Sequence, residues 1–365
     1  MSAKLRSMAK IAESTRRGRA WKTKLPNVEH AISPSHTTRP NPLVSGDRLY
    51  VSVFAPGAIY ALNRQDGSLL WSYQLDTLGS SDVAAYRGLI FAKSSRTLFA
   101  LDGKDGSVRW HFAPKEAPGE WIYSQPTIKD GFVLIGDRCG YLHCLQATTG
   151  AVVWQRLVSK ADNNDVNTTA VVVGQRVITG NNDGAIVCYV LKTGETLWRR
   201  NVDAGCGRQL ARFRSKIAIS ARSLYLLDLK TGRYKLRVSR AKKSFGAICA
   251  TGTGVAAILE TDFHACPGEW GNDSAFNTEL LLITDKSENT LRRLRGSPAL
   301  RMCSETGLLF AANHYGLTAI DPSNGSVVFS RPEWIALPDC GSGWLYGLEE
   351  DGTVFAERIS GFREM

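Results

Sequence analysis

Short apolar runs separated by glycine-containing turns recur along almost the whole chain and predict β-strands. One recurring unit is a strand, an Asp-Gly or Thr-Gly turn, and a second strand that closes in Gly-x-x-x-Trp. Four copies superimpose without gaps, at residues 58–71, 97–110, 141–154 and 185–198. Glycine suits these turns because it adopts a positive φ without steric cost. The pattern therefore predicts an all-β protein.

A second hairpin precedes each copy, as in residues 126–136, where Asp130-Gly131 turns between two apolar runs. One unit is thus four short antiparallel strands in roughly forty residues, which is typical of a propeller blade. Three weaker copies follow, at residues 223–236, 282–291 and 317–329. The first lacks the tryptophan, the second lacks both glycine and tryptophan, and the third has Phe329 in place of tryptophan.

The two ends of the chain complement each other. Residues 343–347 and 353–358 predict two strands that no Gly-x-x-x-Trp strand follows, whereas residues 17–25, around Trp21, predict an outer strand without a blade. Pairing the two ends removes an exposed sheet edge. We therefore predict a single eight-bladed β-propeller over residues 16–365, closed by an N-terminal strand near Trp21. Residues 1–15 form a basic leader that we expect to be flexible.

Charge is unevenly distributed. The net charge is +11, and residues 1–24 hold eight Lys or Arg against one Glu. The rest of the chain is nearly balanced, so we do not expect the folded body to bind nucleic acid, and only the leader suits that role. No window approaches eighteen consecutive apolar residues, so no membrane span is expected.

The eight cysteines show neither a Cys-x-x-Cys pair nor zinc-ligand spacing. The first residues also lack the apolar stretch of a secretory signal. We therefore expect a cytoplasmic protein without a disulfide framework.

The Gly-x-x-x-Trp repeat resembles the pyrroloquinoline-quinone repeat of quinoprotein-like propellers, and the resemblance covers residues 17–359. It implies that each tryptophan packs between neighbouring blades. Quinone-dependent dehydrogenases of this fold use a calcium or lanthanide site and often an adjacent Cys-Cys disulfide. This chain has no adjacent cysteine pair and no matching acidic set, so we expect neither pyrroloquinoline quinone nor another cofactor. The outer-membrane assembly member of the family is a lipoprotein, and a lipobox is not found here.

The resemblance also implies where ligands would bind. The loops between blades and the turns between second and third strands share one face, which surrounds a central funnel. The residues that open the inner strands would line this funnel, although polar groups are expected there even in an inert propeller. We expect ligand contacts from Arg39, Asp82, Tyr123, Gln125, Asn167 and Arg208, with Asp339 among the lining residues and His314 at the rim. Arg39 and Arg208 together would suit an anionic ligand.

The repeat is interrupted by an insertion at residues 260–277, which contains His264, Glu269 and Trp270. Its Pro-Gly-Glu-Trp sequence recurs at residues 118–121, which adds Glu120 and Trp121. One interpretation is a lid that presents Glu and Trp to a ligand, with His264 and Glu269 as candidate catalytic acid–base groups. The other is that Pro-Gly turns recur in loops and that each Trp caps a blade. The spacing of His264 and its neighbours does not match a zinc site, so no metal site is predicted.

Other conspicuous residues follow from the repeat. Cys144 and Cys188 align with Ala61 and Ala100, so we expect them to fill the core, and His143 falls at an apolar position. The basic run at residues 230–243 follows an outer strand, where alternating charges prevent edge-to-edge aggregation.

Two functions remain open. The first is a binding or scaffolding module that docks a protein partner or a small polar ligand at the funnel face. The alternative is a cofactor-independent lyase, hydrolase or cyclase that acts on a small polar or anionic substrate under the insertion.

Overall fold

A computed structural model describes residues 19–31, 41–79, 82–114, 122, 124–160, 164–207, 209–261, 277–284, 287–296, 298–313 and 315–358. These residues form eight four-stranded antiparallel sheets. The fold is an eight-bladed β-propeller, as the repeat predicts. None of the described segments forms a helix of the length and apolarity that a membrane crossing requires. The chain divides into two compact units, residues 1–83 with 298–365 and residues 84–297.

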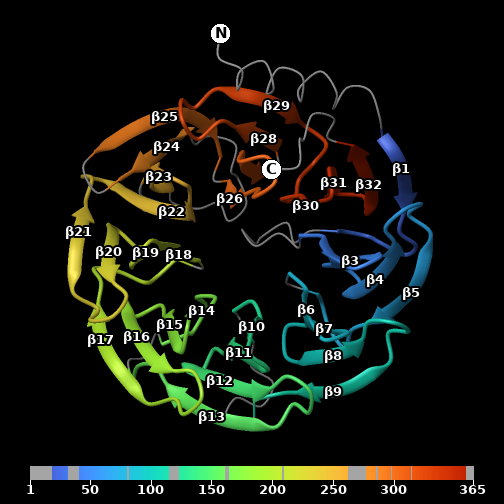
Figure 1. Ribbon diagram of the computed structural model, residues 1–365, viewed down its shortest axis with the longest axis horizontal. Helices are drawn as coiled ribbons and strands as arrows, with labels where there is room; N and C mark the ends of the chain where they lie inside the picture. Colours follow the sequence, from blue (N-terminus) through green and yellow to red (C-terminus); the bar gives the residue numbers. More distant parts are fainter. Residues whose placement is uncertain are drawn as a thin grey trace. The chain divides into compact units, whose positions relative to one another are not determined.

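The first unit contains three blades (Figure 1). Their strands are β2 (Leu43–Ser45), β3 (Arg48–Val53), β4 (Ala58–Asn63) and β5 (Leu69–Gln74); β26 (Ala299–Met302), β27 (Leu309–Asn313), β28 (Gly316–Ile320) and β29 (Val327–Arg331); and β30 (Asp339–Gly341), β31 (Trp344–Leu348), β32 (Thr353–Arg358) and β1 (Arg19–Lys24).

The N-terminal strand completes the last of these blades, as predicted. Strand β1 pairs antiparallel with β32, and Trp21 lies opposite Ala356. Ion pairs of 3.0 Å between Lys22 and Glu349 and 2.7 Å between Lys24 and Asp351 add to the pairing. Because these pairs are partly exposed, the backbone ladder and Trp21 contribute most of the attachment.

The second unit contains five blades (Figure 1). Their strands are β6 (Ala84–Tyr86), β7 (Leu89–Lys93), β8 (Leu98–Asp102) and β9 (Val108–Phe112); β10 (Thr127–Lys129), β11 (Phe132–Gly136), β12 (Tyr141–Gln146) and β13 (Val152–Leu157); β14 (Val171–Val173), β15 (Arg176–Gly180), β16 (Ala185–Val190) and β17 (Thr196–Asn201); β18 (Leu210–Phe213), β19 (Lys216–Ser220), β20 (Leu224–Asp228) and β21 (Tyr234–Val238); and β22 (Lys243–Ala250), β23 (Val255–Thr261), β24 (Asn277–Ile283) and β25 (Glu288–Arg295).

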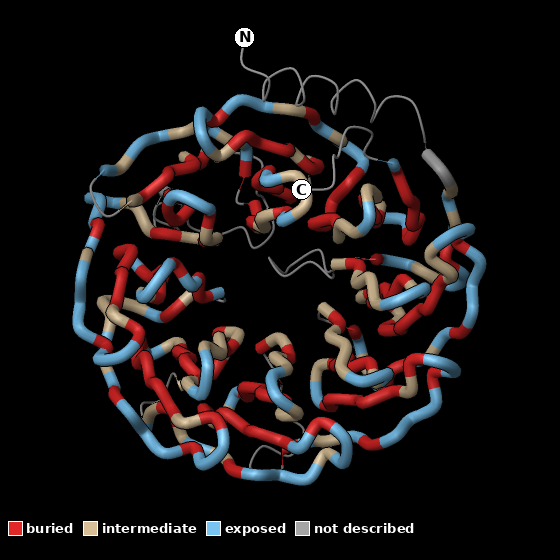
Figure 2. Tube along the Cα trace, in the orientation of Figure 1, coloured by how far each residue is buried: buried red, intermediate tan, exposed pale blue. Residues whose placement is uncertain are grey.

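Burial follows the position of a strand within its blade. The second and third strands are mostly buried, whereas an outer strand such as β13 is largely exposed apart from its tryptophan (Figure 2). Strand β21 is such an outer, edge strand. Arg233, Lys235 and Arg237 are exposed along it or beside it, which agrees with the predicted role of the basic run in protecting an edge.

Four tryptophans, Trp21, Trp110, Trp154 and Trp198, each cover a glycine of the following blade. The indole of Trp154 donates a hydrogen bond of 2.8 Å from Nε1 to the Leu191 carbonyl, and its ring lies over Gly194. The same arrangement joins Trp110 to Ala147 and Gly150, Trp198 to Leu229 and Gly232, and Trp21 to Arg64 and Gly67. The glycine in Gly-x-x-x-Trp therefore has two functions, a positive φ and space for the neighbouring ring.

Cys144 and Cys188 fill the core, as predicted from the alignment. Both are fully buried, and each lies opposite the tryptophan of its own blade, Trp154 or Trp198. Where the tryptophan is replaced by Leu236, the facing residue is the larger Leu226. A small cysteine facing a large tryptophan fills a volume similar to that of two leucines facing each other. Close packing of the core requires such compensation.

Thiol reactivity tests this packing. Burial raises the pKa of the Cys144, Cys188 and Cys206 thiols to about 12 each. We expect a maleimide at pH 8 to modify the half-buried Cys139 and Cys249 first and to reach the other three only after denaturation, because the thiolate is the nucleophile. Peptide mass spectrometry before and after urea would measure this. Rapid modification of Cys144 in the folded protein would contradict the packing.

Cys303 and Cys340 correct the expectation that disulfides are absent. They form a disulfide with a Cα–Cα distance of 6.5 Å, between the residue after β26 and the middle of β30. They are 37 residues apart, close to one blade repeat, so they belong to neighbouring inner strands. Spacing rules for local cysteine motifs cannot detect such a pair.

His143 is packed between blades, as the alignment predicts, and it also has a partner that the alignment does not predict. It is fully buried, its ring lies 5.2 Å from that of Phe112 in the preceding blade, and Nε2 lies 2.7 Å from Asp137 Oδ2. Asp137 Oδ1 also accepts the Tyr141 N–H at 2.9 Å. Asp137 thus provides hydrogen-bond partners both for the turn between β11 and β12 and for the buried His143 ring.

Candidate ligand-binding site at the inner strands

In the first unit, charged residues gather where the inner strands begin. Arg301 lies in β26 and Asp339 is the first residue of β30, and Arg301 Nη2 lies 3.0 Å from Asp339 Oδ1. Asp82 accepts the Asn41 N–H at 2.9 Å. Two carboxylates and one guanidinium therefore meet within this unit.

Asp339 connects three inner strands. Its Oδ2 accepts the N–H of Val44 in β2 at 2.8 Å, and its Oδ1 accepts the N–H of Cys340 at 3.0 Å in addition to the Arg301 contact. Asn41 adds a fourth connection, because its Oδ1 accepts the Leu337 N–H at 3.0 Å. The cluster is held by main-chain groups and does not depend on long side chains alone.

Asp82 is the residue of this cluster whose pKa is shifted. Burial raises the pKa of Asp82, and the negative charge of Asp339 acts in the same direction, whereas the Asn41 hydrogen bond and the Arg301 charge oppose them. Two carboxylates share one guanidinium here, and an incoming cationic group would stabilise the ionised form of Asp82.

The inner strands of the second unit have neutral polar groups. Asn167 donates from Nδ2 to Asn182 Oδ1, and Asn182 Nδ2 donates to Asp165 Oδ2 at 3.2 Å. Thr168 Oγ1 donates to the Gly207 carbonyl at 3.0 Å. The contact with Asn182 gives Asn167 a structural function within the protein.

Gln125 has a buried acceptor. Its main-chain N–H donates to Thr169 Oγ1 at 3.3 Å, but no described residue donates to its side-chain Oε1. A buried polar atom without a partner is costly, about 1–3 kcal/mol. A ligand or water that donates an N–H or O–H would satisfy it.

The structure thus describes three of the predicted site residues and places Asp82 in the first unit and Gln125 and Asn167 in the second. The remaining ones lie outside the described residues and stay predictions: His264, Glu269, Trp270, Glu120, Trp121, Tyr123, Arg39, Arg208 and His314. Strands β23 and β24 include residues 260–261 and 277, so the predicted insertion is shortened to residues 262–276, which also lie outside the description.

Sequence reasoning missed Arg301 and Lys93. Lys93 is only 2% exposed and donates from Nζ to the Ile122 carbonyl at 2.9 Å. In three other blades of the second unit, the same position holds Gly136, Gly180 and Ser220. A lysine where the repeat has glycine or serine is a signal that the alignment contained. No comparable signal marks Arg301, because its blade matches the repeat weakly.

The described residues do not fit the metal site of quinone-dependent dehydrogenases. Among them, no group of three or more His, Cys, Asp or Glu side chains is arranged to hold a metal ion. The two carboxylates that do come together share Arg301, whose charge opposes that of a cation.

The blades, the Gly-x-x-x-Trp repeat and the tryptophan–glycine contacts define a quinoprotein-like β-propeller. The chain belongs to the family described as "Outer membrane protein assembly factor BamB", whose model matches residues 9–235. Propellers of this kind act in general as binding or scaffolding modules.

Curated relatives match only part of the chain. The beta-alanine-activating enzyme of Danio rerio is 34% identical over 137 residues, which cover 35% of this chain and 11% of the enzyme. The outer membrane protein assembly factor BamB of Legionella pneumophila is 26% identical over 110 residues, which cover 30% of this chain and 27% of the relative. This chain therefore spans a minor part of each relative's length.

Among solved structures, the quinohemoprotein alcohol dehydrogenase from Comamonas testosteroni matches with a TM-score of 0.72 at 16% identity, covering 97% of this chain and 78% of the enzyme. At this identity, the likeness shows the fold alone.

Proposed function

We propose that this protein is a binding module that docks a partner protein at the loop face around its inner strands. The observation that carries the proposal is the cluster of Asp82, Arg301 and Asp339, which is fixed by main-chain hydrogen bonds and places two carboxylates around one guanidinium. A Lys or Arg side chain of the partner would enter between the two carboxylates. The buried Oε1 of Gln125 supports an additional contact with a donor group of the partner or of a small polar ligand.

The enzymatic alternative depends on His264 and Glu269, which lie outside the described residues. The described part of the inner strands supports binding better, because its carboxylates are engaged with Arg301 and main-chain N–H groups. We also propose that the protein works without pyrroloquinoline quinone and acts in the cytoplasm. Five of the seven described cysteines are free, which supports this location, whereas the Cys303–Cys340 disulfide is typical of an oxidising compartment; cell fractionation would decide between the two.

The docking proposal predicts that Asp339→Asn lowers partner affinity by about 10-fold or more, because a charge pair in a partly buried interface is worth at least about 1.4 kcal/mol. The measurement is quantitative affinity capture from extracts of the source cells with the wild-type protein and the variant, followed by titration of the captured partner.

Asp102→Asn is the matched control. Asp102 also pairs with an arginine, Arg109, at 2.7 Å, but on an outer hairpin. A partner that binds both variants equally would count against the proposal. A wild-type protein that captures nothing and turns over a small substrate would favour the enzyme instead.

A further inference from the structure

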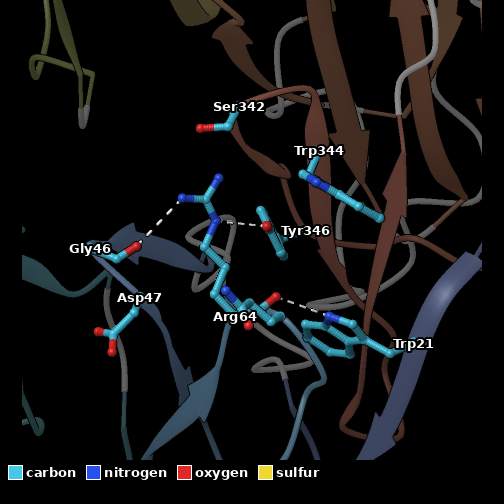
Figure 3. A pocket seen from close by; sticks show the side chains of 8 residues that line it. Trp21, Gly46, Asp47, Arg64, Ser342, Trp344 and Tyr346 are labelled. Carbon is cyan, nitrogen blue, oxygen red and sulfur yellow. Dashed lines mark hydrogen bonds between the residues drawn. The ribbon is translucent and has the colours of Figure 1, made fainter.

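A cavity of about 500 Å³ lies in the first unit and adjoins the charged cluster, because Asp339 is the strand partner of the lining residue Tyr346. Its walls include Trp21, Arg64, Trp344 and Tyr346, and its rim includes Asp47 and Ser342. Figure 3 shows the three aromatic rings on one side of Arg64 and Gly46 and Asp47 on the other. The lining turns, β2–β3, β4–β5 and β30–β31, stand at the opposite strand ends from the predicted ligand face. A cavity of this size accommodates a small organic molecule.

Arg64 departs from the repeat at this cavity. Its main-chain carbonyl accepts the indole N–H of Trp21 at 3.1 Å, which is the contact that Ala147, Leu191 and Leu229 make in other blades. Those three residues are buried and apolar. The backbone contact needs no particular side chain, so the arginine at this position serves the contacts of its own guanidinium.

The guanidinium of Arg64 contacts only neutral acceptors among the described residues. Nε donates to the Tyr346 hydroxyl at 2.8 Å, Nη2 to the Gly341 carbonyl at 2.7 Å, and Nη1 to the Gly46 carbonyl at 3.4 Å. These contacts hold the group rigidly but leave its charge without a carboxylate partner in this part of the structure. A guanidinium has five N–H donors, so two remain for a ligand oxygen.

The nearby acidic side chains are directed elsewhere. Asp47 is largely exposed and lies 3.6 Å from Arg48 Nε, and Glu305 accepts the N–H groups of Ser342 and Gly343 at 2.7 and 3.1 Å. Their charges at the rim disfavour a multiply charged anion such as phosphate. A single carboxylate is therefore a better counter-ion for Arg64.

The aromatic residues supply the apolar part of the site. Trp21 and Tyr346 lie with ring centroids 6.2 Å apart, and the Arg64 guanidinium lies 5.5 Å from the Tyr346 ring centre. Trp344 is half-buried at a position that holds Arg48 and Arg176 in other blades. Flat rings beside a guanidinium match a ligand with a planar apolar body and one negative end.

We propose that this cavity binds a small aromatic carboxylate, with its carboxylate on Arg64 and its ring against Trp344. The cavity lies at the turn ends of β2 and β30, whereas the charged cluster lies at their starts, and binding in the cavity does not depend on partner docking at the cluster. No chemical step is involved, so the site would serve recognition.

Isothermal titration of the full chain with 2-naphthoate and benzoate tests the proposal. Acetate probes the carboxylate without a ring, and benzyl alcohol probes the ring without a carboxylate. We expect the aromatic carboxylates to bind and Arg64→Met to weaken their binding roughly 10-fold or more, because the charge-assisted hydrogen bonds to the carboxylate are lost. Trp344→Leu leaves the three Arg64 hydrogen bonds in place and should weaken naphthoate more than acetate.

Arg200→Met is the matched control, because Arg200 also donates to two carbonyls of a following blade, those of Gly232 and Thr231. It should leave binding unchanged. If Arg64→Met does not fold, as judged by circular dichroism, Trp344→Leu decides the question. The proposal is overturned if no aromatic carboxylate binds, if acetate binds as tightly as naphthoate, or if folded Arg64→Met or Trp344→Leu binds naphthoate like the wild type.

Discussion

Gly194→Ala is expected to lower the free energy of unfolding by about 2–4 kcal/mol, the sum of a left-handed backbone penalty and an overpacking penalty. Gly194 has a φ of +66°, and a Cβ there would lie 2.7 Å from the Trp154 ring. The ring cannot move away easily, because its Nε1 is hydrogen-bonded to Leu191 and the indole is only 5% exposed. Urea denaturation followed by tryptophan fluorescence would measure the loss.

Gly174→Ala provides the control. Gly174 lies in the same blade with a φ of +58°, but nothing lies within 4 Å of the added Cβ. It should therefore cost only the backbone penalty, about 1 kcal/mol. Equal losses for the two variants would show that the tryptophan–glycine contact contributes nothing beyond the turn.

Arg301→Met is expected to lower the free energy of unfolding at pH 7 by about 1–3 kcal/mol, less than for a fully buried pair because the arginine is partly exposed. It removes the charge that compensates Asp82 and Asp339. Arg237→Met is the control, since its 3.0 Å pair with Asp203 lies on an outer strand with the arginine 56% exposed. We expect a loss of about 0–1 kcal/mol there.

The pH dependence of the free energy of unfolding would identify Asp82 as the group whose charge Arg301 compensates. Its pKa in the folded protein is raised, so the folded state binds the proton more tightly than the unfolded chain does. Ionised Asp82 therefore lowers stability, and this cost develops as pH rises from the ordinary carboxyl pKa, 3.8, through the raised value.

Asp82→Asn should remove this loss of stability at neutral pH. In the Arg301→Met background the cost should be larger, and Asp82→Asn should recover part of the loss. Thermal melts between pH 4 and 8 would measure both effects, and parallel profiles with and without Asp82 would contradict the assignment.

Much of the fold was predictable because turn chemistry is local. Asp130 and Gly131 form a turn with φ values of +50° and +84°, which an Asp-Gly pair tolerates, and the flanking apolar runs become β10 and β11. The role of Cys144 also followed from the repeat, since an aligned alanine marks a position too crowded for a large side chain.

The candidate site was less predictable, because its contacts join residues far apart in the chain. Arg301 meets Asp339 across 38 residues, and Asn41 reaches Leu337 across 296. Inner-strand alignment indicated that Asp82 and Asp339 open their strands but not that they share a guanidinium. The Cys303–Cys340 pair was missed for the same reason.

Local patterns of apolar residues and turns were therefore enough to predict eight blades and the pairing of the N-terminal strand with the last blade, because each repeat encodes its own strands and turns. The packing of the tryptophans between blades was implied by the resemblance to quinoprotein-like propellers. Which polar side chains meet, and that Arg64 borders a cavity, depended on the packing of neighbouring blades. Such contacts involve one side chain from each of several repeats, and no single repeat contains that information.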